Sequence, residues 1–239
     1  MSSTTIKPKP PKSSKDAKSS KGSKSSSTSK TPTSDDPKQT HKLSLKGSAK
    51  MVSEFFDYGI NTILFQRGVY PAEDFTYVKK YGLNMLISSD DQVKSYIRRI
   101  TTQLTRWMLA GKIKKLVVVV TSKDTGEDVE RWQFDVSHTK PPTASTSQGA
   151  QEKEKGEAEV QAEIQSLFRQ ITACVTFLPM LDGRCTFNVL VYADGDAEVP
   201  MEWGDSEARE INGGEKVVLR SWGTSSHRVE TAVSYRVVE

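Results

Sequence analysis

The chain has 239 residues and a formal net charge of +4 that is unevenly distributed: residues 1–42 hold ten Lys and three Asp, a balance of +7, which leaves −3 for the rest. No apolar run reaches the length of a membrane-spanning helix, and neither Cys174 nor Cys185 belongs to a C-x-x-C pair. We therefore expect no membrane insertion and no disulfide framework. Since no secretory signal peptide is recognisable, we expect an intracellular chain of one large or two small domains with reduced thiols.

Residues 1–42 differ from the rest of the chain in composition. They contain twelve Ser and ten Lys and almost no large apolar side chain. Such a segment cannot bury enough apolar surface to offset the entropy cost of ordering, so we expect a disordered tail. The run Lys7–Lys12 (K-P-K-P-P-K) is compatible with a weak nuclear signal or a nucleic-acid contact. A solubilising tail is the favoured interpretation, because the segment lacks arginine and the aromatic side chains on which bases stack.

Apolar periodicity predicts two helices in the next part of the chain. The first begins at Ser44, whose hydroxyl can cap a helix, and ends at Arg67-Gly68. The second begins at Ser89 or Asp90, and the apolar run Leu83–Ile87 between the two helices predicts a strand. The side chains expected to face the core of the second helix are Val93, Ile97, Ile100, Leu104 and Trp107.

A hairpin follows these helices. The run Leu116–Thr121 (L-V-V-V-V-T) has the composition of a buried central strand, and Glu130–Val136 returns as an alternating strand. The tripeptide Asp124-Thr125-Gly126 occurs in aspartic proteases, but here it lies between the two strands and is interpreted as a turn. Residues 137–158 lack large apolar side chains, and we expect them to form a flexible surface loop within one domain.

The stretch Glu159–Pro179 predicts a central helix with two faces. Its core stripe comprises Ile164, Phe168, Ile171 and Val175, whereas the opposite face carries a single charge, that of Arg169. An outer face with so few charges suits a helix that also binds a partner. A helix that only packs on the core, and whose outer face carries few charges, fits the pattern equally well.

The remaining sequence predicts strands separated by a glycine-rich connection. Thr186–Tyr192 is strand-like and 194–215 is loop-like. In 229–237 one set of positions alternates with charged or polar neighbours, as in a half-buried strand; the set is Val229, Thr231, Val233, Tyr235 and Val237. An α+β domain with a mostly antiparallel sheet and helices on one side follows from this order. Terminal strands of this kind can exchange sheet edges or make room for an extended peptide; a permanently docked last strand is the alternative.

The sequence contains no recognisable catalytic or metal site. His41, His138 and His227 are not at ligand spacing to one another or to a cysteine, no glycine-rich phosphate loop precedes a helix, and no nucleophile stands at a strand-turn-helix elbow. We therefore expect a binding protein that is not an enzyme and has no metal and no cofactor.

Several strings resemble the HORMA-domain family of spindle assembly checkpoint proteins. The resemblance covers Leu43 to Val238; the Ser/Lys tail and the 137–158 loop depart from it. It implies a HORMA domain over residues 43–239, with a mainly antiparallel sheet packed on three helices and a mobile C-terminal seat belt over 199–239. The strings that carry it are Ser44–Ala49, Glu54–Pro71, Lys115–Val120, Glu130–Asp135, Arg169–Ala173 and Thr176–Pro179.

The resemblance also implies a function and partners. In the family, the seat belt either occupies a sheet edge or closes around a partner peptide, and sequestering the activator subunit of the anaphase-promoting complex delays anaphase. The implied partners are that activator, a coiled-coil checkpoint receptor at the kinetochore, a second copy in an open–closed dimer, and an AAA+ ATPase remodeller with its adaptor. The implied locations are the nucleus, nuclear envelope, kinetochore and cytoplasm.

Individual residues take roles from the same resemblance. Leu45 matches the N-terminal segment that packs differently in the two forms. The helix face for open–closed dimerisation is expected at Arg169, Gln170 and Phe177. Contacts with the partner peptide, or anchoring of the seat belt, are expected at Trp203, Arg220, Trp222 and Tyr235.

Two other interpretations stay open at this point. One is a different HORMA adaptor, of the meiotic chromosome axis or of a translesion polymerase. The other is a nucleic-acid-binding protein acting through its basic tail, for which deletion of residues 1–42 would abolish nucleic-acid binding.

Overall fold

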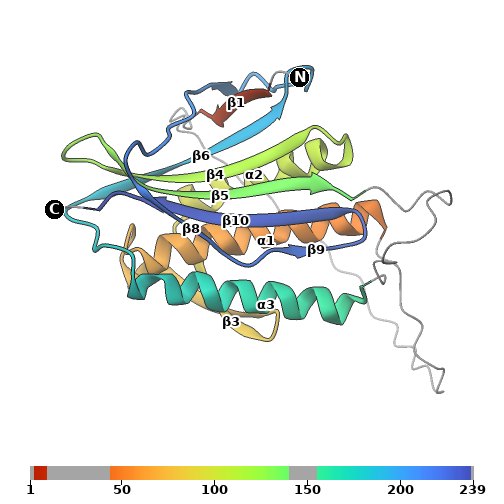
Figure 1. The fold of residues 1–239 in the computed structure, drawn as a ribbon, viewed down its shortest axis with the longest axis horizontal. Coiled ribbons are helices and arrows are strands. Elements are labelled where there is room, and N and C mark those ends of the chain that lie inside the picture. The colour runs from red at the N-terminus through yellow and green to blue at the C-terminus, as the bar shows by residue number, and fades with distance from the viewer. Residues whose placement is uncertain (1–2, 10–43, 140–154, 238–239) are drawn as a thin grey trace, which may run out of the picture.

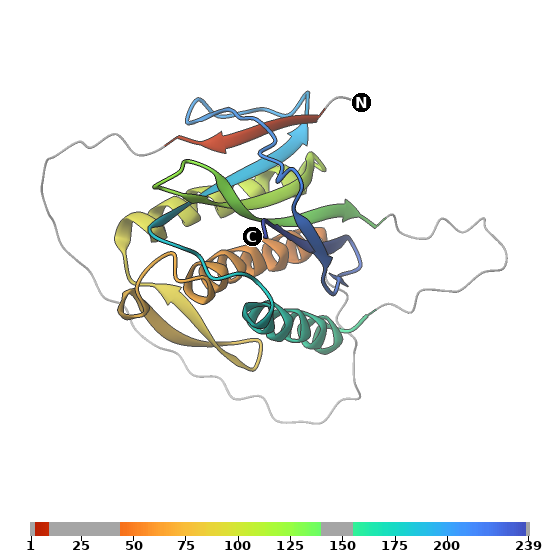
Figure 2. The ribbon, with the colours of Figure 1, turned by 60° about the vertical axis from the view of Figure 1, so that its left-hand side comes forward.

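The computed structural model describes residues 3–9, 44–139 and 155–237, and the remaining residues of the tail and of the 137–158 loop lie outside the described ranges. An antiparallel sheet is covered on one face by three helices (Figure 1), and a hairpin of two further strands lies beyond the first helix (Figure 2). The α+β class, the antiparallel sheet and the three helices are confirmed. The helices are α1 (Leu45–Gln66), α2 (Asp91–Leu109) and α3 (Glu157–Ala173).

The main sheet has the strand order β7-β1-β6-β4-β5-β10-β8, with β9 paired to β10, and all its pairs are antiparallel. The separate hairpin pairs β2 with β3. The strands are β1 (Ser3–Pro8), β2 (Phe75–Lys80), β3 (Leu83–Ser88), β4 (Ile113–Ser122), β5 (Asp128–His138), β6 (Cys185–Asp194), β7 (Trp203–Asp205), β8 (Glu215–Val218), β9 (Trp222–Gly223) and β10 (His227–Tyr235).

Local signals fix the helix starts. The Gly47 N–H donates to Ser44 Oγ at 3.1 Å, so Ser44 caps α1, and Asp90 Oδ1 accepts from the N–H groups of Gln92 and Val93 to cap α2. The long helix α1 is buried along most of its length and forms the centre of the core. Its Phe55 ring lies 5.0 Å from Trp222 and 5.2 Å from Phe168, and so joins the terminal strands to α3.

One part of the expected disordered tail is ordered. Ser3–Pro8 forms β1, which lies between β6 and β7, and Ile6 is only 1% exposed. The expectation was wrong for this segment because composition describes what a segment can bury by itself. The surface that buries Ile6 is supplied by residues almost two hundred positions later in the chain.

Three further boundaries differ from expectation. Phe75–Lys80 is a strand although no apolar run indicated one, and it pairs along its length with β3. The loop expected over 137–158 is shorter, since β5 extends to His138 and α3 begins at Glu157. The helix α3 ends at Ala173 and continues as one 3-10 turn, which buries Cys174 and turns Val175 outward, 38% exposed.

Candidate peptide-binding groove

A single connection crosses from one edge of the sheet to the other. Residues 195–214, called the belt segment here, leave β6, contribute β7 beside β1, and then reach β8 at the opposite edge (Figure 1). The belt segment therefore passes over the sheet face that the helices leave uncovered. Side chains of Val117, Val119 and Leu190 on this face form a small apolar cluster of their own.

The crossing is held by polar contacts at its middle. The Arg209 guanidinium donates to both carboxylate oxygens of Asp128, at 2.9 and 2.6 Å, and to Thr121 Oγ1 at 3.2 Å. Arg131 forms an ion pair with Glu210 at 2.9 Å. A forked arginine–carboxylate pair is both stronger and more directional than a single charged contact, so this part of the belt has a defined position.

Two tryptophans hold the start of the belt segment. The ring of Trp203 in β7 lies 5.0 Å from Trp107 of α2, edge to face, and both are almost fully buried. The Trp107 Nε1–H donates to the Glu198 carbonyl at 3.0 Å. Trp203, expected to contact the peptide or anchor the belt, thus lies at the belt's start. Trp107, for which the sequence indicates a core position, contacts the belt as well.

Between β6 and β7 the belt and the sheet form a slot for one extended strand, and β1 occupies it. Ser3–Ile6 pair with β6 from Asp194 to Val191, and Ile6–Pro8 pair with β7 from Asp205 to Trp203. A strand in this slot forms backbone hydrogen bonds on both edges. This is the geometry with which sheets bind extended peptides.

The other residues expected to contact the peptide or to anchor the seat belt do not line the slot. Trp222, 1% exposed, packs on Phe55, and the Tyr235 hydroxyl donates to Glu215 at 2.6 Å. Both therefore fix the terminal strands to the core and lie away from the slot. Arg220 is exposed, and its backbone N–H donates to Gln170 Oε1 at 2.8 Å.

The residues expected at a dimer face are spread along α3 and the turn after it. Arg169 is exposed beside a hollow of about 280 Å³ between α3, α1 and β3, whereas Gln170 contacts the C-terminal region through Arg220. Phe177 is 44% exposed, 6.3 Å from the Tyr235 ring. Leu45 is 46% exposed at the first position of α1. The dimer and switch roles of these residues stay predictions.

A buried polar cluster ties α1 to the terminal strands. Ser48 Oγ lies 2.6 Å from His227 Nδ1 and 2.5 Å from Thr224 Oγ1, and His227 is fully buried. Burial, reinforced by neighbouring His138 with ring centroids 4.6 Å apart, lowers the pKa of His227 to about 4. The distance between Ser48 and His227 is that of a serine–histidine dyad. Both side chains are buried, so the pair is a structural link between α1 and β10. Sequence reasoning missed this cluster.

A second buried cluster joins the end of α1 to β5. Arg67 Nε pairs with Glu130 at 2.7 Å, and the second oxygen of Glu130 accepts from the Trp132 indole. Burial raises the pKa of Glu130, and the charge of Arg67 opposes that rise. Burial also raises the pKa of the Cys174 thiol to about 11, so the thiol stays protonated near neutral pH and does not supply a thiolate nucleophile.

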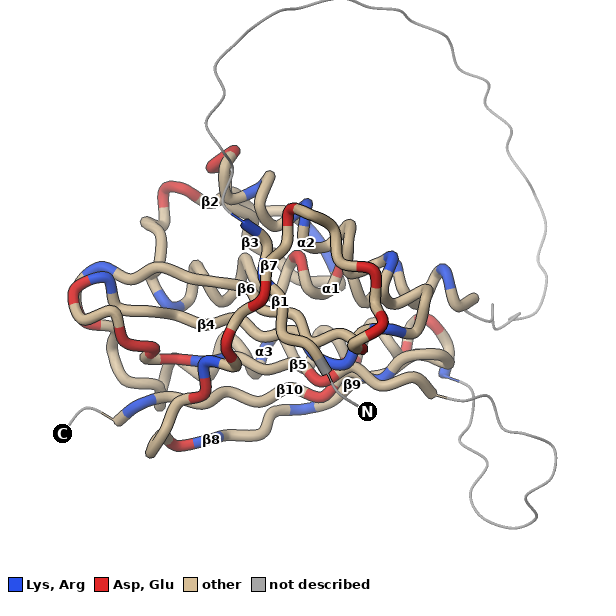
Figure 3. The backbone as a smooth tube through the Cα atoms, turned by 90° about the horizontal axis from the view of Figure 1, so that it is seen from above, with Lys and Arg blue, Asp and Glu red and all other residues tan. Residues whose placement is uncertain are grey.

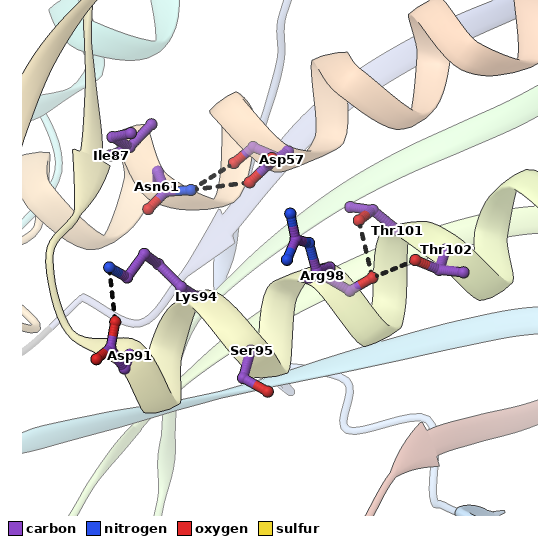
Figure 4. Close-up of a pocket in the computed structure, with 9 residues that line it drawn as sticks. All are labelled: Asp57, Asn61, Ile87, Asp91, Lys94, Ser95, Arg98, Thr101 and Thr102. Atoms are coloured by element: carbon purple, nitrogen blue, oxygen red, sulfur yellow. Dashed lines mark hydrogen bonds and ion pairs between the residues drawn. The ribbon is translucent and has the colours of Figure 1, made fainter. Parts of the chain in front are cut away.

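Another hollow is polar, and none of the elements that line it belongs to the slot. It measures about 670 Å³ and lies between α1, α2 and β3 (Figure 4). Lys94 pairs there with Asp91, and Asn61 donates to Asp57, whose pKa is raised mainly by burial. Over the described residues, no group of three or more His, Cys, Asp or Glu is arranged to hold a metal ion, and no helix is long and apolar enough to cross a membrane.

Comparison with known proteins gives the class of this fold. The HORMA domain family matches residues 48–227, three quarters of the chain. The chain therefore belongs to the HORMA-domain family. HTP-2 of a complex with HTP-3 motif-6 has the same fold, with a TM-score of 0.64 over 82% of this chain and 92% of that chain at 15% identity.

Relatives within the family are spindle checkpoint proteins. The mitotic spindle checkpoint component mad2 of Schizosaccharomyces pombe is 60% identical over 81% of this chain and 94% of its own length. The human mitotic spindle assembly checkpoint protein MAD2A is 43% identical over 82% of this chain and 93% of its own. A chain of the mitotic checkpoint complex is 56% identical, with a TM-score of 0.72 over 79% of this chain and 98% of that chain. Within the HORMA-domain family, this chain is a member of the spindle checkpoint group.

Proposed function

We propose that this chain is the peptide-binding switch of a spindle assembly checkpoint, in which the belt segment closes over an extended partner peptide paired to β6. The observation that carries the proposal is the slot between β6 and β7. It holds an extended segment by both backbone edges, while the belt segment crosses the sheet and is fixed on the far edge. In this proposal the protein acts by binding a peptide and catalyses no reaction.

The proposed partners are those that the family resemblance implies. A closely similar chain is part of the mitotic checkpoint complex, which supports binding of the activator of the anaphase-promoting complex and hence a delay of anaphase. A coiled-coil receptor at the kinetochore, an open–closed self-dimer and an AAA+ remodeller with its adaptor complete the proposed set. The proposed locations are the nucleus, nuclear envelope and kinetochore, and the cytoplasm.

Identity favours the checkpoint over the other interpretations. The checkpoint relatives match at 43–60% over about four fifths of the chain, whereas HTP-2 shares only the fold at 15% identity. A nucleic-acid-binding role would depend on the tail, most of which lies outside the described residues. No observation in the described part of the chain favours it.

The strand pairing at the far end of the belt segment explains why binding and release of a peptide would be slow. The belt segment continues into β8, which pairs with β10, and β10 pairs with β5 over nine residues from His227 to Tyr235. Opening the belt requires β10 to leave β5. Exchanging one set of strand pairs for another conserves most backbone hydrogen bonds, so two packings can differ by only a few kcal/mol. A partner that binds the closed form about 10⁴-fold more tightly is enough to invert a 1:99 population.

The proposal is tested by the kinetics of peptide binding. Fluorescent peptides from the kinetochore receptor and from the activator are incubated with the full chain, and dissociation is followed after adding unlabelled peptide. The Arg209→Ala variant removes the belt's link to Asp128 and should release peptide several-fold faster. Arg228→Ala, which removes an exposed pair with Glu230 outside the belt, is the matched control. Failure of the full chain to bind either peptide, or equal release by the parent chain and Arg209→Ala, would contradict the clamp.

A further inference from the structure

The segment in the slot is part of this chain and precedes the domain by more than thirty residues. Besides the two ladders, the Thr5 carbonyl accepts from the Ser206 N–H at 3.0 Å, and the Lys9 N–H donates to the Glu202 carbonyl at 2.7 Å. Residues 3–9 are therefore bound along both edges, to β6 on one side and to the belt segment on the other. They lie where the proposed partner peptide would lie.

Side chains of this segment fit the slot at alternate positions. Ile6 is 1% exposed and belongs to the main hydrophobic core, and Pro8 is also buried, whereas Thr5 and Lys7 are only half-buried. Successive side chains of a strand point to opposite faces, so the slot accepts apolar side chains two residues apart. In the slot, the segment buries the side chains of Ile6 and Pro8, which an undocked segment would expose to solvent.

The backbone of Pro8 fits the same arrangement. Thr5 and Lys9 direct their backbone groups to the belt, so residues of the opposite parity direct theirs to β6. The ladder with β6 ends at Ile6, the last such residue before Pro8. Proline has no N–H to donate. Pro8 lies beyond the end of the ladder with β6, so its missing N–H removes no hydrogen bond from that ladder.

Charge also matches between the segment and the belt. The stretch 194–210 contains seven Asp and Glu and one Arg, and Figure 3 shows acidic residues gathered along its path beside β1 and β7. The bound segment is basic, with Lys7 and Lys9, and the Lys9 ammonium donates to the Met201 carbonyl at 3.1 Å. An acidic belt over a basic strand favours this occupant over an acidic peptide.

The connection to α1 is long enough for the segment to reach its own slot. Residues 10–43 separate β1 from the start of the domain, and 34 extended residues can span on the order of 110 Å. A domain of this size is about 40 Å across, so the path is not limited by length. Tethering makes docking intramolecular, and an external peptide then competes against an effective concentration on the order of millimolar.

We propose that residues 3–9 are a built-in ligand of the peptide slot, an N-terminal motif with apolar side chains at Ile6 and Pro8 that closes the belt over the chain itself. This inference rests on the proposed function and adds regulation to it. A partner peptide must displace the N-terminal motif, and the chain can adopt the closed form with no partner bound.

The probe for this inference is a fluorescent synthetic peptide of residues 2–12 (S-S-T-T-I-K-P-K-P-P-K). It is titrated against the full chain and against a variant lacking residues 2–9. The deletion variant should bind the peptide, whereas the full chain should bind it about tenfold to a hundredfold more weakly, because its own motif fills the slot. Absence of binding to the folded deletion variant, or equal binding to both proteins, would overturn the inference.

Matched peptides test the register. A peptide with Ile6→Asp should bind the deletion variant about thirtyfold more weakly or worse, because it places a charge where a buried isoleucine belongs. A peptide with Lys7→Gln, changed at the neighbouring position on the other face, should keep most of its affinity. Equal loss in both peptides would mean that the contact is electrostatic and that the observed register is wrong.

Two further measurements keep the test interpretable. A full-length Ile6→Asp variant, with circular dichroism to verify its fold, should take up the peptide as the deletion variant does; failure to do so while folded would also count against the inference. The exclusion of the 2–12 peptide from the slot of the full chain should not change with protein concentration, since the N-terminal motif is tethered to the same chain. Exclusion that fades on dilution would mean that the motif occupies a second copy.

The same variants separate this inference from the proposed function. Receptor and activator peptides should bind more tightly to the deletion variant than to the full chain. If they bind both proteins equally, the slot is a partner site but the N-terminal motif does not regulate it. If only the 2–12 peptide binds, the motif is a ligand but the checkpoint partners are not.

Discussion

His227 lies in the interior between Ser48, Thr224 and His138, and its environment makes folding depend on pH. Its pKa is lowered from 6.5 to about 4 by burial and then by His138. Between about pH 6.5 and about pH 4 the unfolded chain binds a proton at His227, whereas the folded chain does not. The free energy of unfolding therefore decreases as pH falls through that interval.

The corresponding prediction concerns acid sensitivity. Between about pH 7 and about pH 5, the urea midpoint of the parent chain should fall more steeply than that of His227→Gln, which cannot bind the proton. Carboxyl groups titrate in the same range in both proteins, so the difference between their slopes is the quantity that matters. Parallel slopes would mean that His227 is not the buried neutral group described above.

The ion pair of Arg67 and Glu130 gives a second prediction at this scale. Both side chains are almost fully buried, and Arg67 also donates to the Pro179 carbonyl. Glu130→Ala leaves a buried guanidinium without its counter-charge and should lower the free energy of unfolding by about 3–5 kcal/mol. Glu127→Ala removes an exposed pair with Arg236 and should cost about 1 kcal/mol or less. Chemical denaturation of the two variants decides; equal losses would contradict the assignment of burial.

Among the elements, α3 contributes to the core on one side and offers Arg169 on the other. Ile164, Phe168 and Ile171 are buried, as the periodicity predicts, whereas Arg169 points away from them beside a shallow hollow. Arg169→Ala should therefore weaken self-association, measured by sedimentation, and leave the unfolding midpoint unchanged. Gln161→Ala, two turns earlier on an exposed site, is the control. A variant that unfolds would contradict the two-faced description of α3.

The terminal strand β10 is a structural element that also holds the far end of the belt segment, through its pairing with β8. It lies between β5 and β8 and contributes Val229 and Val233 to the core. A chain ending at Ser226 would lose these side chains and a nine-residue ladder, so we expect it not to fold cooperatively in a thermal scan. A cooperative transition close to that of the parent would show that β10 is an optional strand, and the belt would then need no undocking step.

At the scale of the whole molecule, the sequence predicted those elements whose signals are local. The cap at Ser44, the hairpin of β4 and β5 and the alternation in β10 all appear as expected. What it could not predict depends on distant residues. Ile6 is a single isoleucine in a Ser/Lys tail, and only the slot formed by β6 and β7 makes it a core residue.

The candidate site was predicted in part for the same reason. Trp203 lies beside the slot. Trp222 and Tyr235 are buried and fix the terminal strands to the core, which is the anchoring position that was one of the two roles expected for them. No sequence pattern indicated the crossing held by Arg209 and Asp128, because these residues are far apart in the chain and only the fold brings them together.

A closed belt that must undock before a peptide can exchange is the central claim, and a reversible staple tests it most directly. Val136 and Val229 lie opposite each other on β5 and β10. Backbone groups of Val229 face away from β5, so this is a narrow pair whose Cα atoms, about 4.5 Å apart, suit a disulfide. The double variant Val136→Cys, Val229→Cys would lock β10 to the sheet when oxidised and free it when reduced.

The measurement is exchange of a fluorescent partner peptide by this double variant under oxidising and reducing conditions, with the parent chain and its two native cysteines as control. The oxidised variant should neither admit nor release peptide, and reduction should restore exchange to the rate of the parent. Exchange at the same rate in both conditions would mean that peptides enter without undocking of β10, and the belt would not be a clamp.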